Sequence, residues 1–297
     1  MTNSNRIIIP CPCGSERDYQ NCCEPFVLPV SFPSSDLHAT QQRPMSETDL
    51  LDWLDKYSFA TSASFNEKAR PYVFRISKYL DGILDTYADK EFIGDSGCPQ
   101  STSEILAALK HNILLTMFAS LRCLSEGLFL QSGVLMRSAI EDCFVFLDLC
   151  LNEDQIERFL QDKYKASAAL TRIKPYIPSI LTKWYGYFSA NFTHAGPLHQ
   201  AHILPWACYP DNWILVTGLQ NLVRCVVTYH IVLERAYLSS ISDPWFWKVR
   251  GQTVSFDEDS KVFEWAESLG KDVTEHFPPH AKHPGFTYSD KPYKLKA

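Results

Sequence analysis

Apolar residues recur every three or four positions along most of the chain between residues 47 and 276. In the stretch 71–88, for example, the apolar positions include Val73, Ile76, Leu80 and Ile83. This spacing places them on one face of an α-helix, whereas the alternating pattern of a half-buried strand is rare in the chain. The pattern therefore predicts an all-α fold class, and we expect a helical bundle.

Polar and turn residues indicate where these helices begin and end. Ser46 precedes an acidic and then apolar run, which is typical of a capped helix start. Two further helices are expected within 103–151, with Gly127 or Gly133 as the joint between them. Another helix is expected over 152–173. The second half of the chain adds expected helices at 179–192, 212–241 and 257–276.

Composition divides the chain into four parts. Residues 28–46 are rich in Pro, Ser, Thr and Gln, which predicts an irregular linker. The linker separates a short segment, 1–27, from the helical bundle domain, 47–276. Residues 277–297 are polar and predict a flexible tail.

The first segment contains four cysteines in two close pairs, Cys11 and Cys13 followed by Cys22 and Cys23. Four thiolates form a complete tetrahedral shell for zinc, and the short loop between the pairs closes at little cost in chain entropy. We therefore expect one Zn²⁺ bound by these four residues. The alternative is a pair of disulfides, but the other cysteines lie in apolar helical segments typical of reduced thiols.

The residues around the cysteines extend this pattern, with Pro12 inside the first pair and Gly14, Ser15 and Tyr19 between the pairs. Their order and spacing closely resemble the SEC-C motif, which is known from the C-terminal tail of the SecA translocase and from many unrelated bacterial proteins. The resemblance implies a zinc knuckle that recruits a protein partner, or the ribosome or RNA.

Charge and hydropathy set limits on the environment of the protein. The net charge is −6, which argues against a surface covered in basic patches, although a local groove can still bind phosphate. The N-terminus has no signal-peptide pattern, and the longest stretch without Asp, Glu, Lys or Arg, 184–210, is interrupted by Pro197 and Pro205. We therefore expect a cytoplasmic protein without membrane insertion.

The most apolar predicted helix contains two opposite charges one turn apart, Arg137 and Glu141, within the run 134–147. Residues four apart face the same side of a helix and can pair. Burial of such a pair costs several kcal/mol unless other groups satisfy it, and a functional site is one reason to bear that cost. The alternative is an intrahelical salt bridge that fixes the register of the helix.

A second polar group ends the helix expected over 179–192, where Tyr185, Ser189 and Asn191 precede His194. An Arg-x-x-x-Glu helix combined with a helix that ends in Ser and His resembles the HEPN-like helical domains of bacterial toxin and defence systems. The resemblance implies an RNA-directed toxin or phage-defence effector, and a homodimer that completes the site. The implied site comprises Arg137, Glu141, Ser189 and His194.

The chain departs from the HEPN pattern at one position. HEPN ribonucleases place an arginine four to six residues before the histidine, but positions 187–190 here are Tyr, Phe, Ser and Ala. Only Arg137 can then supply the positive charge. The implied reaction is metal-independent: His194 takes the 2′-hydroxyl proton, Arg137 stabilises the phosphorane, and Glu141 orients either residue. Alternatively, His194 caps the carboxyl end of its helix.

Two other clusters also have alternative interpretations. His194, His199 and His202 have spacings that suit a second metal site, but no carboxylate lies among them and a chance group of imidazoles is more common. The aromatic triplet 245–247 either closes the core or contacts a partner or a second copy of the chain.

Common enzyme motifs, such as a Gly-rich phosphate loop or His-Glu-x-x-His, are not found in the sequence. Two hypotheses therefore remain. In the first, the helical body is an RNA-directed effector that the zinc knuckle recruits to its target, and its site residues converge on an open cleft. In the second, the protein is a non-enzymatic adaptor or scaffold that binds a protein partner through the knuckle. The same residues are then buried and mutually satisfied.

Overall fold

The computed structural model describes residues 47–88, 100–193, 212–251 and 253–276. This part is mostly helical, which confirms the all-α prediction for the residues described. The predicted knuckle, linker and tail lie outside these residues. The helices are α2 (Glu47–Tyr87), α3 (Gln100–Ser125), α4 (Phe129–Leu151), α5 (Glu153–Leu160), α6 (Ala169–Ile173), α7 (Ser179–Phe188), α9 (Asn212–Ala236) and α10 (Lys261–His276).

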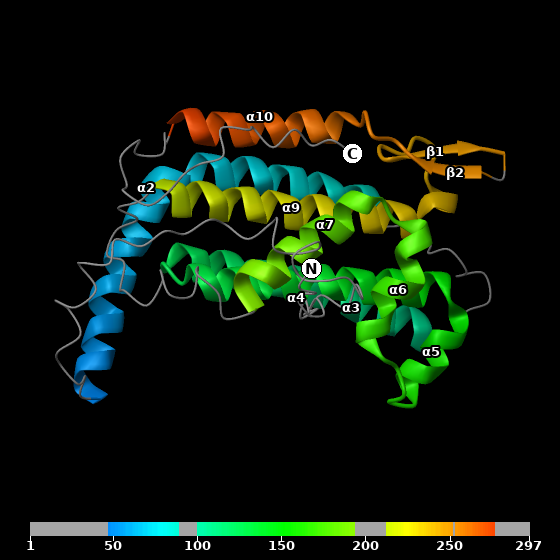
Figure 1. Cartoon of the computed structure of the whole chain (residues 1–297), viewed down its shortest axis with the longest axis horizontal. Coiled ribbons are helices and arrows are strands. Elements are labelled where there is room, and N and C mark those ends of the chain that lie inside the picture. Colours follow the sequence, from blue (N-terminus) through cyan, green and yellow to red (C-terminus); the bar gives the residue numbers. More distant parts are fainter. Residues whose placement is uncertain (1–46, 89–99, 194–211, 252, 277–297) are drawn as a thin grey trace, which may run out of the picture.

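The helices are arranged in layers, as Figure 1 shows. α10 lies along one side, α2 and α9 form the middle layer, and α3 and α4 lie on the other side. α4 contacts α3, α9, α6 and α7, so it is the helix through which the layers are joined. The site residues predicted on α4 are consequently held by several neighbouring elements.

The first long helix is continuous through a proline. α2 runs through Pro71, which lies inside it. A proline in a helix removes one backbone hydrogen bond and favours a bend, and Figure 1 shows that α2 changes direction along its length. Ile76, Leu80 and Ile83 are buried, as their spacing predicted, because this part of α2 packs against α9.

The two candidate joints between α3 and α4 have different roles. Gly127 has a positive φ of 82° in the turn between the helices, a conformation that favours glycine. Gly133 lies inside α4, where a Cβ atom would be only 2.1 Å from the ring of Phe192. The first glycine therefore makes the joint, and the second permits close packing of residues 189–193 on α4.

The prediction of a single helix over 152–173 is wrong, because the chain leaves the helical conformation after Leu160. Asp162 has a φ of 56°, and a 3₁₀ turn at Ala166–Ala168 precedes α6. This loop lets Arg172 of α6 pair with the fully buried carboxylate of Asp148 on α4 at 2.5 Å. Periodicity alone does not reveal such a long-range pair.

The helices in the second half of the chain occur in the predicted order, but they end at different residues from those predicted. α7 continues as a π-helical turn, Ser189–Thr193, and α9 ends at Ala236 before a 3₁₀ turn at Leu238–Ser240. Two short antiparallel strands, β1 (Trp247–Arg250) and β2 (Thr253–Phe256), then form a hairpin that the all-α prediction did not include. The hairpin leads into α10.

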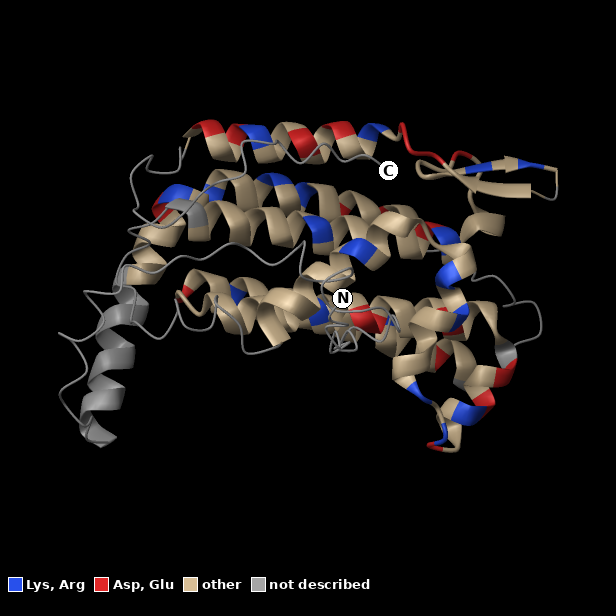
Figure 2. Ribbon diagram, in the orientation of Figure 1, with Lys and Arg blue, Asp and Glu red and all other residues tan. Residues whose placement is uncertain are grey.

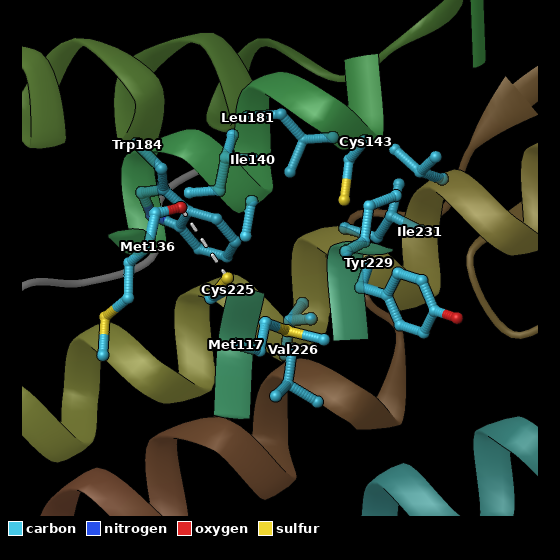
Figure 3. Packing of buried hydrophobic residues seen from close by; sticks show 14 of the residues in the cluster. Met117, Met136, Ile140, Cys143, Leu181, Trp184, Cys225, Val226, Tyr229 and Ile231 are labelled. Atoms are coloured by element: carbon cyan, nitrogen blue, oxygen red, sulfur yellow. Dashed lines mark hydrogen bonds between the residues drawn. The ribbon is translucent and has the colours of Figure 1, made fainter. Parts of the chain in front are cut away.

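The core is built around α9, as Figure 3 shows for the part that faces α4. Leu215, Cys225, Val227 and Ile231 on this helix are fully buried. The thiol of Cys225 points at the backbone carbonyl of Met136 at 3.9 Å. Because α9 packs against α2, α4 and α10, its side chains are apolar nearly all round.

A buried polar network ties the hairpin to this core. The ring of His230 on α9 lies 2.5 Å from the Tyr79 hydroxyl and 3.1 Å from the Tyr87 hydroxyl. Glu234 accepts a hydrogen bond from the backbone N–H of Phe246 at 2.6 Å. Burial lowers the pKa of His230 to about 3, so the imidazole is neutral and makes no ion pair with Glu234.

The aromatic triplet 245–247, whose last residue begins β1, divides between the two predicted roles. Phe246 and Trp247 are buried, which confirms the core interpretation for these residues, whereas Trp245 is 54% exposed.

Two described helices are long and apolar enough to cross a membrane, namely Thr102–Ser125 and Ile214–Ala236. The second is mostly buried in the bundle, as core helices of soluble proteins are. The cytoplasmic location stays a prediction.

Candidate functional site

The candidate site lies where α4 faces α7 and the π-helical turn. Figure 2 shows that long stretches of α3, α4 and α9 carry no charge, whereas both acidic and basic residues are spread along α10. Arg137 and Glu141 are exceptions on α4, one helical turn apart. Their charged groups form the predicted ion pair, with 3.0 Å between Arg137 Nη1 and Glu141 Oε2.

Arg137 donates two further hydrogen bonds to residues that are distant in the sequence. Its Nε donates to the Ser189 hydroxyl at 3.1 Å, and its Nη2 donates to the Tyr185 hydroxyl at 2.6 Å. The guanidinium carbon also lies 5.0 Å from the centre of the Tyr185 ring, within cation–π range. The structure therefore brings together three of the four predicted site residues and adds Tyr185.

These contacts do not use all the donors of Arg137. A guanidinium has five N–H bonds, and the three partners each take one. One N–H on Nη1 and one on Nη2 are left without a partner among the described residues. The side chains of Arg137 and Glu141 are 24% and 28% exposed, so the group is accessible from outside. Such an arginine can bind an oxyanion while its position stays fixed.

The fold explains why Ser189 reaches Arg137. Gly133 lies one turn before Arg137 on α4 and has no side chain to keep the Phe192 ring at a distance. The buried π-helical turn can therefore lie directly on α4, and Ser189, which is 1% exposed, meets the guanidinium. The geometry of the site thus depends on a glycine that makes no polar contact itself.

Burial changes the acid strength of two groups close to Arg137. It raises the pKa of Tyr185, while the positive charge of Arg137 acts in the opposite direction. Burial together with the nearby charge of Glu141 raises the pKa of Asp142 to about 6. Tyr185 thus remains a neutral hydroxyl, and Asp142 changes its charge close to neutral pH.

Sequence reasoning did not include Asp142 or Tyr185 in the predicted site. Asp142 follows Glu141 directly, and two adjacent carboxylates in an apolar helix are a signal that could have drawn attention to it. Tyr185 lies four residues before Ser189, on the same face of the helix. Its contact with Arg137 depends on how α7 packs against α4, which the local sequence does not define.

Other predicted site residues fall outside the described part of the chain. These are His194, with its neighbours His199 and His202, and the four cysteines Cys11, Cys13, Cys22 and Cys23. Among the residues that are described, no group of three or more His, Cys, Asp and Glu side chains could hold a metal ion. The four thiols suit zinc chemically, since soft sulfur ligands in two close pairs are typical of structural zinc sites.

The observed arrangement satisfies parts of both hypotheses for the body. Arg137, Glu141 and Ser189 converge, and the two charged side chains are partly open to solvent, whereas the effector hypothesis also requires His194, which lies outside the described residues. Ser189 is buried, and three groups already engage the guanidinium, as the scaffold hypothesis expects. The two N–H bonds without a described partner are what distinguish this group from a closed structural ion pair.

Comparison with known proteins identifies the N-terminal segment alone. A search of curated proteins and a search of solved structures found no match to the chain. A family model described as the SEC-C motif matches residues 9–25, which include all four cysteines of the predicted zinc knuckle. The chain therefore contains a SEC-C motif at residues 9–25.

Proposed function

We propose that the helical body is an RNA-directed HEPN-like effector of a toxin or phage-defence system, with Arg137 as the group that binds a phosphate. The observation that supports this most strongly is the partly exposed guanidinium, which three neighbours hold in place while two N–H bonds have no described partner. Donors held in a fixed geometry are suited to an oxyanion, because they need no rearrangement when it binds.

The proposed reaction is transesterification within RNA. His194 removes the proton from a 2′-hydroxyl, and the 2′-oxygen attacks the adjacent phosphorus atom. Arg137 stabilises the added negative charge of the phosphorane. The bond to the 5′-oxygen then breaks, and that oxygen receives the proton from His194, which leaves a 2′,3′-cyclic phosphate and a 5′-hydroxyl. Glu141, Ser189 and Tyr185 act as positioning residues, because each holds Arg137 rather than the substrate.

The zinc knuckle has a separate role in this proposal. The SEC-C motif at residues 9–25 would bind Zn²⁺ through Cys11, Cys13, Cys22 and Cys23, and it would recruit the body to a protein, ribosome or RNA target. A small module of this kind depends on its ion for stability, so its loss would abolish recruitment and spare the chemistry. A homodimer is part of the same proposal, since a second copy would complete the site.

The test is cleavage of total bacterial RNA and of tRNA by the full chain, with and without EDTA. Arg137→Gln and His194→Ala are the test variants, and Arg122→Gln, an exposed arginine on α3, is the matched control. Zinc content is measured in the same samples, so that loss of zinc from the knuckle is not mistaken for loss of a catalytic metal. We expect cleavage to survive EDTA and the control substitution, and to be lost in both test variants.

The second candidate function is a non-enzymatic adaptor. The observation that favours it is the set of three partners around Arg137, which resembles a structural ion-pair network. If the protein is an adaptor, neither the unaltered chain nor any of the three variants cleaves RNA. Arg137→Gln then lowers the free energy of unfolding by about 3 kcal/mol, because it leaves Glu141 without its partner. Absence of cleavage combined with such a loss of stability would support the adaptor and reject the ribonuclease.

A further inference from the structure

α7 carries a second arginine–tyrosine contact on the side away from Arg137. Tyr187 lies two residues after Tyr185, so the two rings point to nearly opposite sides of the helix. The guanidinium carbon of Arg224, on α9, lies 5.1 Å from the centre of the Tyr187 ring. The helix therefore has one arginine from α4 against one side and one from α9 against the other.

Arg224 differs from Arg137 because no carboxylate neutralises it among the described residues. It makes none of the ion pairs found in this part of the chain. α7 and the π-helical turn contain no Asp or Glu, and the acidic residue of α9, Glu234, lies ten residues away, about 15 Å along the helix. Glu234 is already engaged by the backbone of Phe246.

Asn221 lies directly against Arg224 and is left with unsatisfied donors. Its Oδ1 accepts a hydrogen bond from Arg224 Nη1 at 2.5 Å. Because a guanidinium can only donate, this contact fixes which end of the amide faces the arginine. The Nδ2 atom of Asn221 is buried and has no hydrogen-bond partner in the part of the chain that the structure describes, and the whole residue is only 1% exposed. A buried donor without an acceptor is unfavourable by about 1–3 kcal/mol.

We propose that Arg224 and Asn221 form an oxyanion subsite that binds a phosphate group. Both residues carry donors, Arg224 has no carboxylate partner among the described residues, and the buried Nδ2 of Asn221 has no acceptor there, which a phosphate oxygen can supply. Lys183 lies four residues before Tyr187 on the same face of α7, and its exposed ammonium group adds positive charge. This subsite goes beyond the proposed function, which uses only the Arg137 side of α7.

The subsite is tested by calorimetric titration of the full chain with inorganic phosphate. The titration uses the Arg137→Gln protein, so that the proposed ribonuclease site contributes no phosphate binding. Asn221→Asp is the main variant, because the new carboxylate has the shape of the amide and pairs with Arg224. Asn112→Asp, at an exposed position of α3, adds the same charge elsewhere and is the matched control.

We expect the Arg137→Gln protein and its Asn112→Asp derivative to bind phosphate equally, and Asn221→Asp to weaken binding by about tenfold or more. Arg224→Gln provides a second variant with the same expected loss, in case Asn221→Asp fails to fold. The inference would be overturned if the Arg137→Gln protein itself bound no phosphate. It would also be overturned if the Asn221→Asp and Asn112→Asp derivatives bound phosphate with equal affinity.

The source of the phosphate is separated by a second titration with a single-stranded RNA of ten nucleotides. If the subsite holds the RNA backbone, Asn221→Asp weakens the binding of both RNA and phosphate. If it holds a free phosphate or a small phosphorylated ligand, only phosphate binding changes, and the oxyanion subsite still stands. Failure of the ribonuclease proposal does not affect either titration, because Arg137 has already been replaced.

Discussion

Arg137 and Tyr185 are joined by two contacts at once. The guanidinium donates a hydrogen bond of 2.6 Å to the Tyr185 hydroxyl and lies 5.0 Å from the centre of the same ring. The two residues are 48 positions apart, and their contact connects α4 to α7. Because the ring restricts the guanidinium from one side, the two N–H bonds of Arg137 that have no described partner keep a defined direction.

The first prediction concerns the hydroxyl of Tyr185. Tyr185→Phe keeps the ring and removes the hydrogen bond, so we expect the free energy of unfolding to fall by about 1.5 kcal/mol. If the body cleaves RNA, the rate should fall by about tenfold, because Arg137 loses one of its positioning contacts. Urea denaturation and RNA cleavage are the measurements, with the exposed Tyr176→Phe as control. Equal behaviour of both variants would contradict the positioning role.

The second prediction tests how the π-helical turn is held on α4. In Gly133→Ala, the new methyl group would lie 2.1 Å from Phe192, so the turn that carries Ser189 must move. We expect a loss of about 1–3 kcal/mol in thermal or urea denaturation. Gly82→Ala is the control, because no atom lies within 4 Å of its Cβ and alanine favours a helix. The prediction fails if both substitutions stabilise the protein.

The third prediction concerns pH. The pKa of Asp142 is raised to about 6 in the folded protein, mainly by burial, whereas an unfolded aspartate has a pKa of about 3.9. The folded state therefore holds the proton more tightly, and its stability decreases as the pH rises from about 4 to 6. Above pH 6 the ionised carboxylate remains unfavourable, so Asp142→Asn should melt at a higher temperature than the unaltered protein at pH 7.5.

Melting curves at pH 4.5, 6 and 7.5 test this prediction. The other carboxylates titrate in the same way in the unaltered protein and in Asp142→Asn. The difference between the melting temperatures of the two proteins therefore isolates the effect of Asp142. We expect this difference to be small at pH 4.5 and largest at pH 7.5. A difference that is constant over this range would show that Asp142 titrates normally.

The fourth prediction concerns the proposed zinc knuckle. Cys22→Ala removes one of four thiolates, so we expect the protein to lose its zinc, because three sulfur ligands no longer complete the tetrahedral shell. The helical body should keep its melting temperature, since its core is built from residues of α2 to α10. Zinc is measured by metal analysis and melting by circular dichroism, with Cys123→Ala, on α3, as control. Joint loss of zinc and of the helical body would contradict independent modules.

The sequence by itself determined the features that depend on neighbouring residues. Helical periodicity predicted the all-α body, because residues three or four apart share a face of a helix wherever that helix lies. The same short-range rule predicted the Arg137–Glu141 pair, and the spacing of four cysteines identified the SEC-C motif. The continuity of α2 through Pro71 and the break after Leu160 were not predicted, because tertiary packing can carry a helix through a proline or interrupt it for a buried ion pair.

Only the tertiary structure decided what surrounds Arg137 and Arg224. Ser189 reaches Arg137 across 52 residues because Gly133 allows close packing, and the buried Nδ2 of Asn221 has no hydrogen-bond partner among the described residues. The raised pKa of Asp142 also follows from burial, which no local pattern measures. Such contacts depend on how several helices fill space together, and their free energies belong to the packed bundle rather than to any single segment.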